Sequence, residues 1–352
     1  MPSNTQKSKV LVIGANGYLG TAIGRTFVRA GWQTYGLVRN PEAAQALSLE
    51  EIIPIVRDLK DPSVDKILSS EAGYFDVAVV TVEDLANYTG FVESIIDLLR
   101  SLAQANAANG SKLFVLFSSG TKDWGQTGLA NAPGLKPLDE ESPRQPPAFL
   151  KERSEVSCRI FDQGDAFDAA LVTPVNLYGL SASSTGYFFR MAEKAQKSGS
   201  VLQLRAHPKT ILQFIHVDDC AQAYLALVDP KNAYLALADP KNRKNVEGRF
   251  IAVAGSHYET LEEIAEALVI DYQLPDDVQY LTEDGVKTAL LDFVVFGFSQ
   301  WFSGKRIQEI TGWTTKRSEF SKDIHTYRKA FEAADTQGHP VVEKFDTIIG
   351  HF

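Results

Sequence analysis

A chain of 352 residues with a net charge of −9 is long enough for one large domain with a smaller lobe, or for two domains. The negative charge argues against nucleic acid and anionic membrane as main partners, since both demand clustered lysine and arginine. Residues 1–10 carry no apolar signal core, and Cys158 and Cys220 lack the spacing of a metal site or of a disulfide framework. We therefore expect a reduced, cytoplasmic protein that binds no metal.

The first structural pattern is a short apolar run, KVLVIG (9–14), which leads straight into GANGYLG (14–20). Such a run is typical of a buried parallel strand, and a helical pattern follows it as far as Gly31. Glycine at this turn lets the backbone approach a pyrophosphate, and the helix start supplies N–H donors and partial positive charge. The turn therefore predicts a dinucleotide site that contains Gly14, Asn16, Gly17, Tyr18, Leu19 and Gly20.

The second run, QTYGLVRN (33–40), ends in Arg39 rather than in aspartate or glutamate. An acidic residue at this place bonds the ribose 2′-hydroxyl of NAD, whereas arginine suits a 2′-phosphate. Arg39 therefore favours NADP(H) over NAD as the cofactor. The alternative is an ordinary solvated arginine at the end of a strand.

Four more apolar runs alternate with helical patterns: IIPIV (52–56), DVAVVTV (76–82), KLFVLF (112–117) and AALVTP (169–174). This alternation predicts an α/β fold with a doubly wound parallel Rossmann sheet. Ligands of such sheets bind beyond the carboxyl ends of the strands. The segments after these runs therefore add further expected cofactor contacts, namely Asp58, Leu59, Thr81, Ser118, Pro174 and Asn176.

Later patterns complete the predicted organisation of the chain. We expect helices over 91–108, 187–198 and TLEEIAEAL (260–268), a loop rich in proline and glycine over 125–147, and a late strand in RFIAVAG (249–255). We assign residues 1–178 to the dinucleotide-binding domain, which returns at about 214–256. Residues 179–213 and 257–352 are assigned to a smaller substrate-binding lobe.

A ten-residue duplication stands in the second half, where AYLALVDPKN (223–232) is followed by AYLALADPKN (233–242). The copies differ only at Val228 and Ala238, and they are far shorter than the repeats of solenoid proteins. We interpret the duplication as a tandem insertion that lengthens a connection between a helix and a loop.

Six motifs that span almost the whole chain resemble those of the extended short-chain dehydrogenase/reductase superfamily, in particular its NAD-dependent epimerase/dehydratase-like members. They are GANGYLG, Asp58 after the third strand, FSSG (117–120), TPVNLYG (173–179), FIHVDD (214–219) and SGKRIQEITGW (303–313). The resemblance implies a Rossmann fold, a nicotinamide dinucleotide, a small-molecule substrate and, as in many members, a homodimer.

A narrower resemblance is to the plant progesterone β-reductase and iridoid synthase group, whose members are NADPH-dependent and act on enones. GWQTYGLVRNP (31–41) is similar to the second strand of that group, and SGTKDWG (119–125) to its glycine-x-lysine-histidine-tyrosine segment. The second similarity puts Lys122 at the position of a lysine that lines the active site there. The histidine and tyrosine of that segment are replaced here by Asp123 and Trp124.

The usual catalytic triad of the superfamily is absent from its expected positions. The pair Tyr-x-x-x-Lys is replaced by Phe149 and Arg153, and Gly120 stands where serine or threonine is usual. Arg153 can still donate to the nicotinamide ribose, but a guanidinium does not readily release a proton. Two arginines that are common elsewhere in the superfamily are replaced by Thr173 and Gln213.

The proton donor or electrophile must therefore be another residue, and Lys122 is the first candidate. An ammonium group in apolar surroundings can stabilise an oxyanion, and desolvation lowers its pKa towards neutrality. Ser119 is expected to bond a substrate carbonyl, and Tyr178 is a nearby replacement phenol. Glu83 and Asp84 are alternatives as a general base, although carboxylates in loops are usually solvated.

Three functions are compatible with these residues. The first is an NADPH-dependent reductase of a small, fairly apolar carbonyl or enone in specialised metabolism, in which Lys122 and Ser119 stabilise the oxyanion. The second is a non-redox isomerase or cyclase on the same scaffold, since a rearrangement does not need the missing phenol. The third is a non-catalytic regulatory protein that binds NADP(H).

Overall fold

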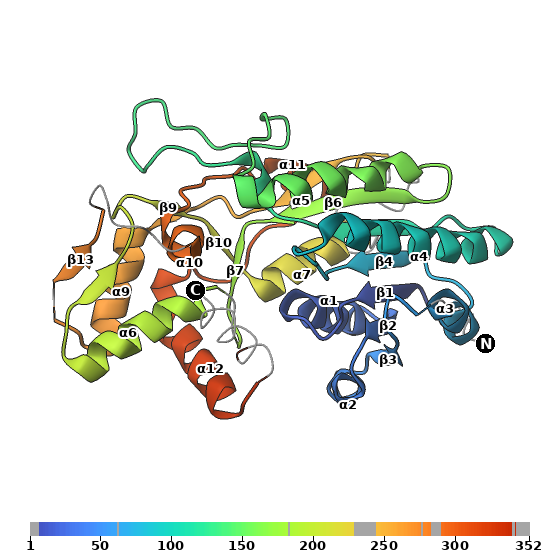
Figure 1. Cartoon of the computed structure of the whole chain (residues 1–352), viewed down its shortest axis with the longest axis horizontal. Coiled ribbons are helices and arrows are strands. Elements are labelled where there is room, and N and C mark those ends of the chain that lie inside the picture. Colours follow the sequence, from blue (N-terminus) through green and yellow to red (C-terminus); the bar gives the residue numbers. More distant parts are fainter. Residues whose placement is uncertain are drawn as a thin grey trace.

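A seven-stranded parallel sheet forms the centre of the larger part of the molecule (Figure 1). The computed structural model describes residues 7–61, 63–181, 184–228, 244–275, 277–282, 290–339 and 342. The sheet has the spatial order β3-β2-β1-β4-β5-β6-β11, so the predicted α/β Rossmann fold is confirmed. Its strands are β1 (Lys9–Ile13), β2 (Gln33–Val38), β3 (Ile53–Val56), β4 (Val77–Val80), β5 (Phe114–Ser118), β6 (Asp168–Pro174) and β11 (Phe250–Val253).

Helices cover both faces of this sheet (Figure 1). Val10 and Val12 of β1 belong to a core shared with α1 and α7, whereas Leu11 and Ile13 belong to a core shared with α3 and α4. Because both faces are buried, the strands read as continuous apolar runs. The helices of this part are α1 (Tyr18–Arg29), α2 (Pro41–Leu49), α3 (Val64–Ala72), α4 (Tyr88–Ala108), η1 (Thr121–Trp124), η2 (Ala148–Leu150), α5 (Lys151–Val156), η3 (Ser157–Gln163), α7 (Val217–Ala226) and α11 (Lys305–Thr311).

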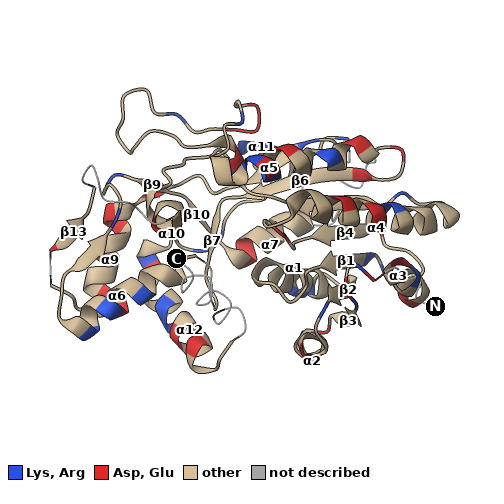
Figure 2. Cartoon of the chain, in the orientation of Figure 1, with Lys and Arg blue, Asp and Glu red and all other residues tan. Residues whose placement is uncertain are grey.

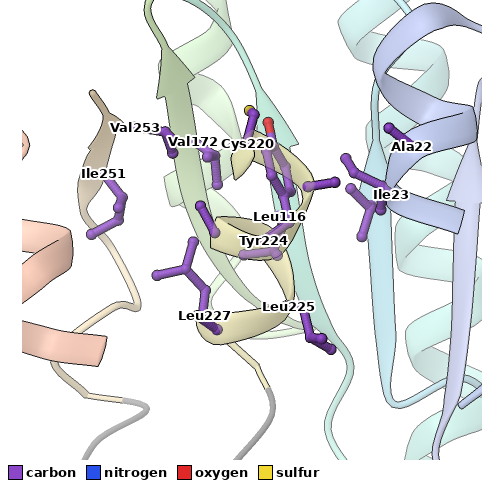
Figure 3. Packing of buried hydrophobic residues seen from close by; sticks show 14 of the residues in the cluster. Ala22, Ile23, Leu116, Val172, Cys220, Tyr224, Leu225, Leu227, Ile251 and Val253 are labelled. Carbon is purple, nitrogen blue, oxygen red and sulfur yellow. The ribbon is translucent and has the colours of Figure 1, made fainter. Parts of the chain in front are cut away.

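Helix α7 packs against α1 on the same face of the sheet (Figure 3). Cys220 and Tyr224 of α7 are fully buried in the core that also contains Ala22 and Ile23 of α1. Tyr224 Oη donates to Ser118 Oγ at 2.8 Å, so the helix also holds the end of β5. The first copy of the duplication begins within α7, whereas the second copy, and with it the expected insertion, lies outside the described residues.

A smaller lobe lies beside the sheet, on the left of Figure 1, and has a hydrophobic core of its own. Thr260 caps α9 in a reciprocal arrangement with Glu263, which defines where that helix begins. Charged residues of both signs are interleaved on α6 and α12 (Figure 2), where Arg190 bonds Asp335 at 2.6 Å. The lobe contains α6 (Gly186–Ser198), α9 (Leu261–Tyr272), α10 (Leu290–Asp292), η4 (Phe293–Gly297), η5 (Ser321–Asp323), α12 (Ile324–Thr336) and the strand pairs β8 (Leu202–Leu204) with β13 (Val278–Tyr280) and β9 (Ile211–Leu212) with β12 (Glu259–Thr260). Where the chain passes between sheet and lobe, β7 (Asn176–Tyr178) pairs with β10 (Phe214–His216).

The long loop over 125–147 crosses the top of the molecule in Figure 1 and is fastened to the segment that follows η4. Leu138 N donates to Trp301 O at 2.9 Å, and Thr127 N donates to Ser299 O at 2.9 Å. The loop thereby joins the lobe to the edge of the sheet. The exact division of the chain between sheet domain and lobe stays a prediction. In the part of the chain that the structure describes, every helix is too short or too polar to cross a membrane.

Candidate functional site

The glycine turn after β1 is tightly packed, and at Gly20 it leaves no room for a side chain. Gly14 has φ +86°, a left-handed conformation that glycine adopts without strain. A Cβ atom at Gly20 would lie 2.1 Å from Gly14 O and 2.8 Å from Thr81 Oγ1. Thr81 Oγ1 donates to Ile13 O at 3.0 Å, so the start of α1 lies directly against the ends of β1 and β4.

Replacing Gly20 with alanine is expected to lower the free energy of unfolding by about 1–3 kcal/mol, the usual cost of overpacking a filled site. The added methyl group collides with backbone that cannot move without disturbing β1. Denaturation by urea without added ligand measures the change. Gly164→Ala is the matched control, since Gly164 has φ −59° and open space around its Cβ position. Equal stability of the two variants would contradict this account of the turn.

The first turn of α1 has no capping side chain. Gly17 is the N-cap residue, while Asn16 is exposed and Leu19 is half-buried nearby. A pyrophosphate at this place would meet helix N–H donors and the positive end of the helix, so the turn fits a dinucleotide. The Tyr18 side chain points elsewhere, because its hydroxyl donates to Gly179 O at 2.5 Å, on the chain that enters the lobe.

The residues predicted to bind the rest of the cofactor lie at the same edge of the sheet. Arg39 directly follows β2 and is exposed, while Asp58 and Leu59 follow the end of β3. Arg57 N donates to Val38 O at 2.8 Å, which brings the ends of β2 and β3 together. The individual cofactor contacts of these residues stay predictions.

The short helix η1 follows the end of β5 and carries the candidate electrophile, Lys122. Trp124 is 2% exposed and packs edge-on against Phe302, which anchors one end of η1. The Gln300 amide donates to Thr121 O at 2.8 Å and to Gly125 O at 2.7 Å. The helix is therefore held by the chain that follows η4 as well as by the sheet.

Arg153 forms a buried ion pair with Asp123. Its Nη2 and Nε lie 2.7 and 3.0 Å from Asp123 Oδ1, and the two side chains are 10% and 2% exposed. Ser119 Oγ donates to the other carboxylate oxygen at 2.9 Å, and Glu83 Oε1 lies 3.5 Å from Arg153 Nη1. The guanidinium is thus directed at carboxylates, and its contact with the nicotinamide ribose stays a prediction.

Lys122 faces a different set of groups. Its Nζ donates to Asn176 Oδ1 at 2.5 Å and lies 5.1 Å from the centre of the Phe298 ring. Burial, and secondly the positive charge of Arg153, lowers the pKa of Lys122 to about 7. Among the described residues, no carboxylate forms an ion pair with it. An amine in this state can donate a proton and stabilise an oxyanion.

The structure brings the predicted serines to this site and puts the predicted phenol in the lobe. Ser118 ends β5, and Ser119 follows it beside η1. Pro174 ends the neighbouring strand, β6. Tyr178 lies in the aromatic core of the lobe, where its hydroxyl donates to Ser318 O and burial raises its pKa. The hydroxyl is therefore used within the lobe, and a catalytic role for Tyr178 stays a prediction.

The two positions at which the resemblance led us to expect arginine hold buried, uncharged side chains. Thr173 is fully buried in β6. The Gln213 amide donates to Gly255 O at 2.9 Å and to Phe302 O at 3.0 Å, and it accepts from Phe302 N at 2.8 Å. These positions therefore supply no positive charge to a ligand.

Several features of the site were not predicted from the sequence. They are the pairing of Asp123 with Arg153 and the contacts of Phe298 and Gln300 with η1. The sequence did hold a signal for this pair. Asp123 replaces a histidine and Arg153 replaces a lysine of the motifs described above, so a negative and a positive charge appear together. Phe298 and Gln300 lie in a segment without a motif, so no pattern points to them. Within the described ranges, no three potential metal ligands cluster.

The likeness to solved structures extends over nearly the whole chain. The UDP-glucuronic acid 4-epimerase of Bacillus cereus, solved with UDP-glucuronic acid and NAD, is 16% identical with a TM-score of 0.66, over 92% of this chain and 99% of that chain. The dTDP-glucose 4,6-dehydratase of Bacillus anthracis str. Ames, solved with NAD, is 13% identical with a TM-score of 0.66, over 93% of this chain and 97% of that chain. At such low identity these likenesses show the fold.

The sequence itself is similar to a yeast protein and to the pattern of one protein family. The uncharacterized protein YLL056C of Saccharomyces cerevisiae is 29% identical over 136 residues, which are 38% of this chain and 44% of the yeast protein. The match thus spans less than half of that relative's length. Residues 10–235, more than half of the chain, match the pattern described as the NAD dependent epimerase/dehydratase family. The chain belongs to this family, within the extended short-chain dehydrogenases/reductases.

Proposed function

We propose that this chain is an NADP(H)-dependent oxidoreductase that reduces a small, fairly apolar carbonyl or enone compound. The observation that carries the proposal is the amine of the half-buried Lys122 side chain, which is held by the neutral Asn176 amide and has its pKa lowered by desolvation to about 7. Such an amine is partly protonated at neutral pH and releases its proton readily, as carbonyl reduction requires. The similarity of SGTKDWG (119–125) to the enone-reductase segment supports the same assignment.

The glycine turn supports a nicotinamide dinucleotide as the cofactor. A Gly20 side chain would fill the space against Gly14, and the uncapped start of α1 offers N–H donors to a pyrophosphate. The two bacterial relatives described above were solved with NAD. The exposed guanidinium of Arg39 after β2 favours the 2′-phosphate of NADP(H).

Replacing Arg39 with aspartate is expected to weaken NADPH binding by about 10- to 100-fold, the value of a charge-assisted hydrogen bond to phosphate. The new carboxylate repels the 2′-phosphate and suits the 2′-hydroxyl of NADH, so the preference should reverse. Isothermal titration calorimetry with NADPH and with NADH measures the two dissociation constants, and their ratio gives the preference. Arg29→Asp makes the same charge change at the far end of α1 and should leave the preference intact. An unchanged NADPH preference in Arg39→Asp would show that another residue determines it.

The side chains around Lys122 have distinct parts in the reaction. A bound NADPH supplies the hydride. Protonated Lys122 Nζ donates a hydrogen bond to the substrate oxygen on which negative charge develops, and then transfers its proton. Loss of that proton leaves a neutral amine, which burial favours. Ser119 Oγ donates to Asp123 in this structure, so it holds Asp123 and offers its lone pairs to a ligand.

The surroundings of Lys122 favour an apolar substrate over the sugar nucleotides named for the bacterial relatives. Phe298 lies beside Nζ, and Phe293 packs edge-on against Phe298. Thr173 and Gln213 provide no cation for a diphosphate. These features support a small carbonyl or enone without phosphate groups.

Purified protein with NADPH and a panel of alkyl and aryl ketones and enones, with UDP-sugars for comparison, tests the proposal. NADPH oxidation coupled to loss of a ketone or enone supports it, whereas conversion of a UDP-sugar contradicts the apolar substrate. An isomerase or cyclase is the second candidate, favoured by Phe149 in place of a phenol, and it would form product without net change in NADPH. Cofactor binding with no conversion would indicate a regulatory protein.

A further inference from the structure

Asn176 is held in one orientation from both sides of its amide group. Its Oδ1 accepts from Lys122 Nζ at 2.5 Å, and its Nδ2 donates to Gln213 O at 3.3 Å. Gln213 is itself fixed by three hydrogen bonds to backbone groups. If the amide were flipped, its NH2 group would face the Lys122 ammonium, donor against donor, and its oxygen would face Gln213 O, acceptor against acceptor. The amide oxygen must therefore face Lys122.

We propose that Asn176 is a positioning residue, which fixes the Lys122 amine at the edge of the sheet while leaving it free to gain and lose a proton. The inference rests on the proposed function of Lys122. An amide oxygen satisfies one donor of the amine whether or not the amine is charged. A carboxylate at the same place would also orient the amine, but it would keep it permanently protonated.

The other charged groups near Lys122 do not replace this role. Desolvation is the larger cause of the lowered pKa of Lys122, and the positive charge of Arg153 on α5 is the second cause, because it disfavours the ammonium form. Asp123 on η1 and Glu83 after β4 are both paired with Arg153. Phe298, which lies beside Lys122 Nζ, and Gln300, which donates to Thr121 O of η1, are uncharged. The neutral contact to Asn176 therefore leaves the effects of burial and Arg153 on Lys122 unopposed.

Replacing Asn176 with aspartate tests the inference without any substrate. Lysine labelled with 13C at Cε reports the protonation of each amine by NMR, and the signal missing in Lys122→Met identifies Lys122. In Asn176→Asp the midpoint of the Lys122 titration should rise by about 1–3 pH units, as for an amine that gains an adjacent carboxylate. Asn131→Asp adds the same charge in an exposed loop and should leave the midpoint unchanged. An unmoved midpoint in Asn176→Asp overturns the proposal.

A second variant tests the position of the Lys122 amine without adding a charge, and it keeps the test valid if Asn176→Asp does not fold. Asn176→Ser keeps a neutral acceptor on a shorter side chain, so the Lys122 midpoint should stay near the wild-type value while turnover falls at every pH. A full rate at all pH values would overturn the positioning role. In Asn176→Asp, the pH above which kcat/KM declines should rise together with the NMR midpoint. A shifted midpoint in a protein that reduces no carbonyl would refute the proposed function alone, and turnover with no shift would refute the inference alone.

Discussion

Replacing Lys122 with methionine is expected to lower kcat for NADPH oxidation by about 10²- to 10³-fold, the loss seen when one oxyanion donor is removed. Methionine has a similar length and fills the space beside Phe298, but it has no proton to give. Because the lost hydrogen bond strengthens only as charge develops, kcat and kcat/KM should fall together while KM changes little. Steady-state rates over a range of substrate and NADPH concentrations measure the effect.

The control for this variant is Lys136→Met, which removes an exposed lysine of the loop over 125–147 and should leave kcat unchanged. Thermal unfolding tells a catalytic loss from a folding defect. Lys122→Met should be at least as stable as the wild type, because it removes an amine whose charged form is disfavoured by burial. A stable Lys122→Met protein with wild-type kcat would rule out the mechanism proposed for this site.

Replacing Arg153 with alanine is expected to lower the free energy of unfolding by about 3–5 kcal/mol, the cost of removing one partner of a buried ion pair. Asp123 would keep its position in the interior, with Ser119 Oγ as its remaining side-chain donor. The uncompensated charge, rather than the lost attraction, accounts for most of this cost. Urea denaturation of the protein without cofactor measures the change.

Arg159→Ala is the matched control for the Arg153 variant. Arg159 Nη1 lies 3.1 Å from Glu93 Oε1, but the two side chains are 46% and 60% exposed, so their removal should cost less than about 1 kcal/mol. The double variant Arg153→Met with Asp123→Asn should recover much of the lost stability, since it removes both charges. If Arg153→Ala costs no more than Arg159→Ala, the buried pair does not stabilise the fold.

Most of the sheet could be predicted because its strands are continuous apolar runs bounded by clear turns. KVLVIG (9–14) and AALVTP (169–174) coincide closely with β1 and β6, since both faces of each strand are buried. The start of α4 was less clear. The predicted helix begins at residue 91, whereas α4 begins at Tyr88, because Tyr88 and Phe91 both pack into the core under the sheet. The intervening threonine and glycine weaken the helical pattern.

The candidate site could be predicted only in part, because its contacts join residues that are distant in the sequence. Lys122 and Asn176 are 54 residues apart, and Asp123 and Arg153 are 30 residues apart. The order of strands indicates which segments share an edge of the sheet, but it does not determine which side chains face each other. Lys122 was a candidate only through the expected likeness of its segment to a motif, and its catalytic role stays a prediction. Its neutral partner depends on side-chain geometry that periodicity does not encode.

The hydrogen bond between Tyr18 and Gly179 ties the glycine turn to the chain that enters the lobe. Gly179 has φ +99°, and a Cβ atom there would lie 2.2 Å from the His216 ring, so the junction is tightly held on its other side as well. Tyr178, the residue directly before this junction, packs in the core of the lobe. The first turn of α1 is therefore fixed through Tyr18 to the same short stretch of chain that anchors the lobe.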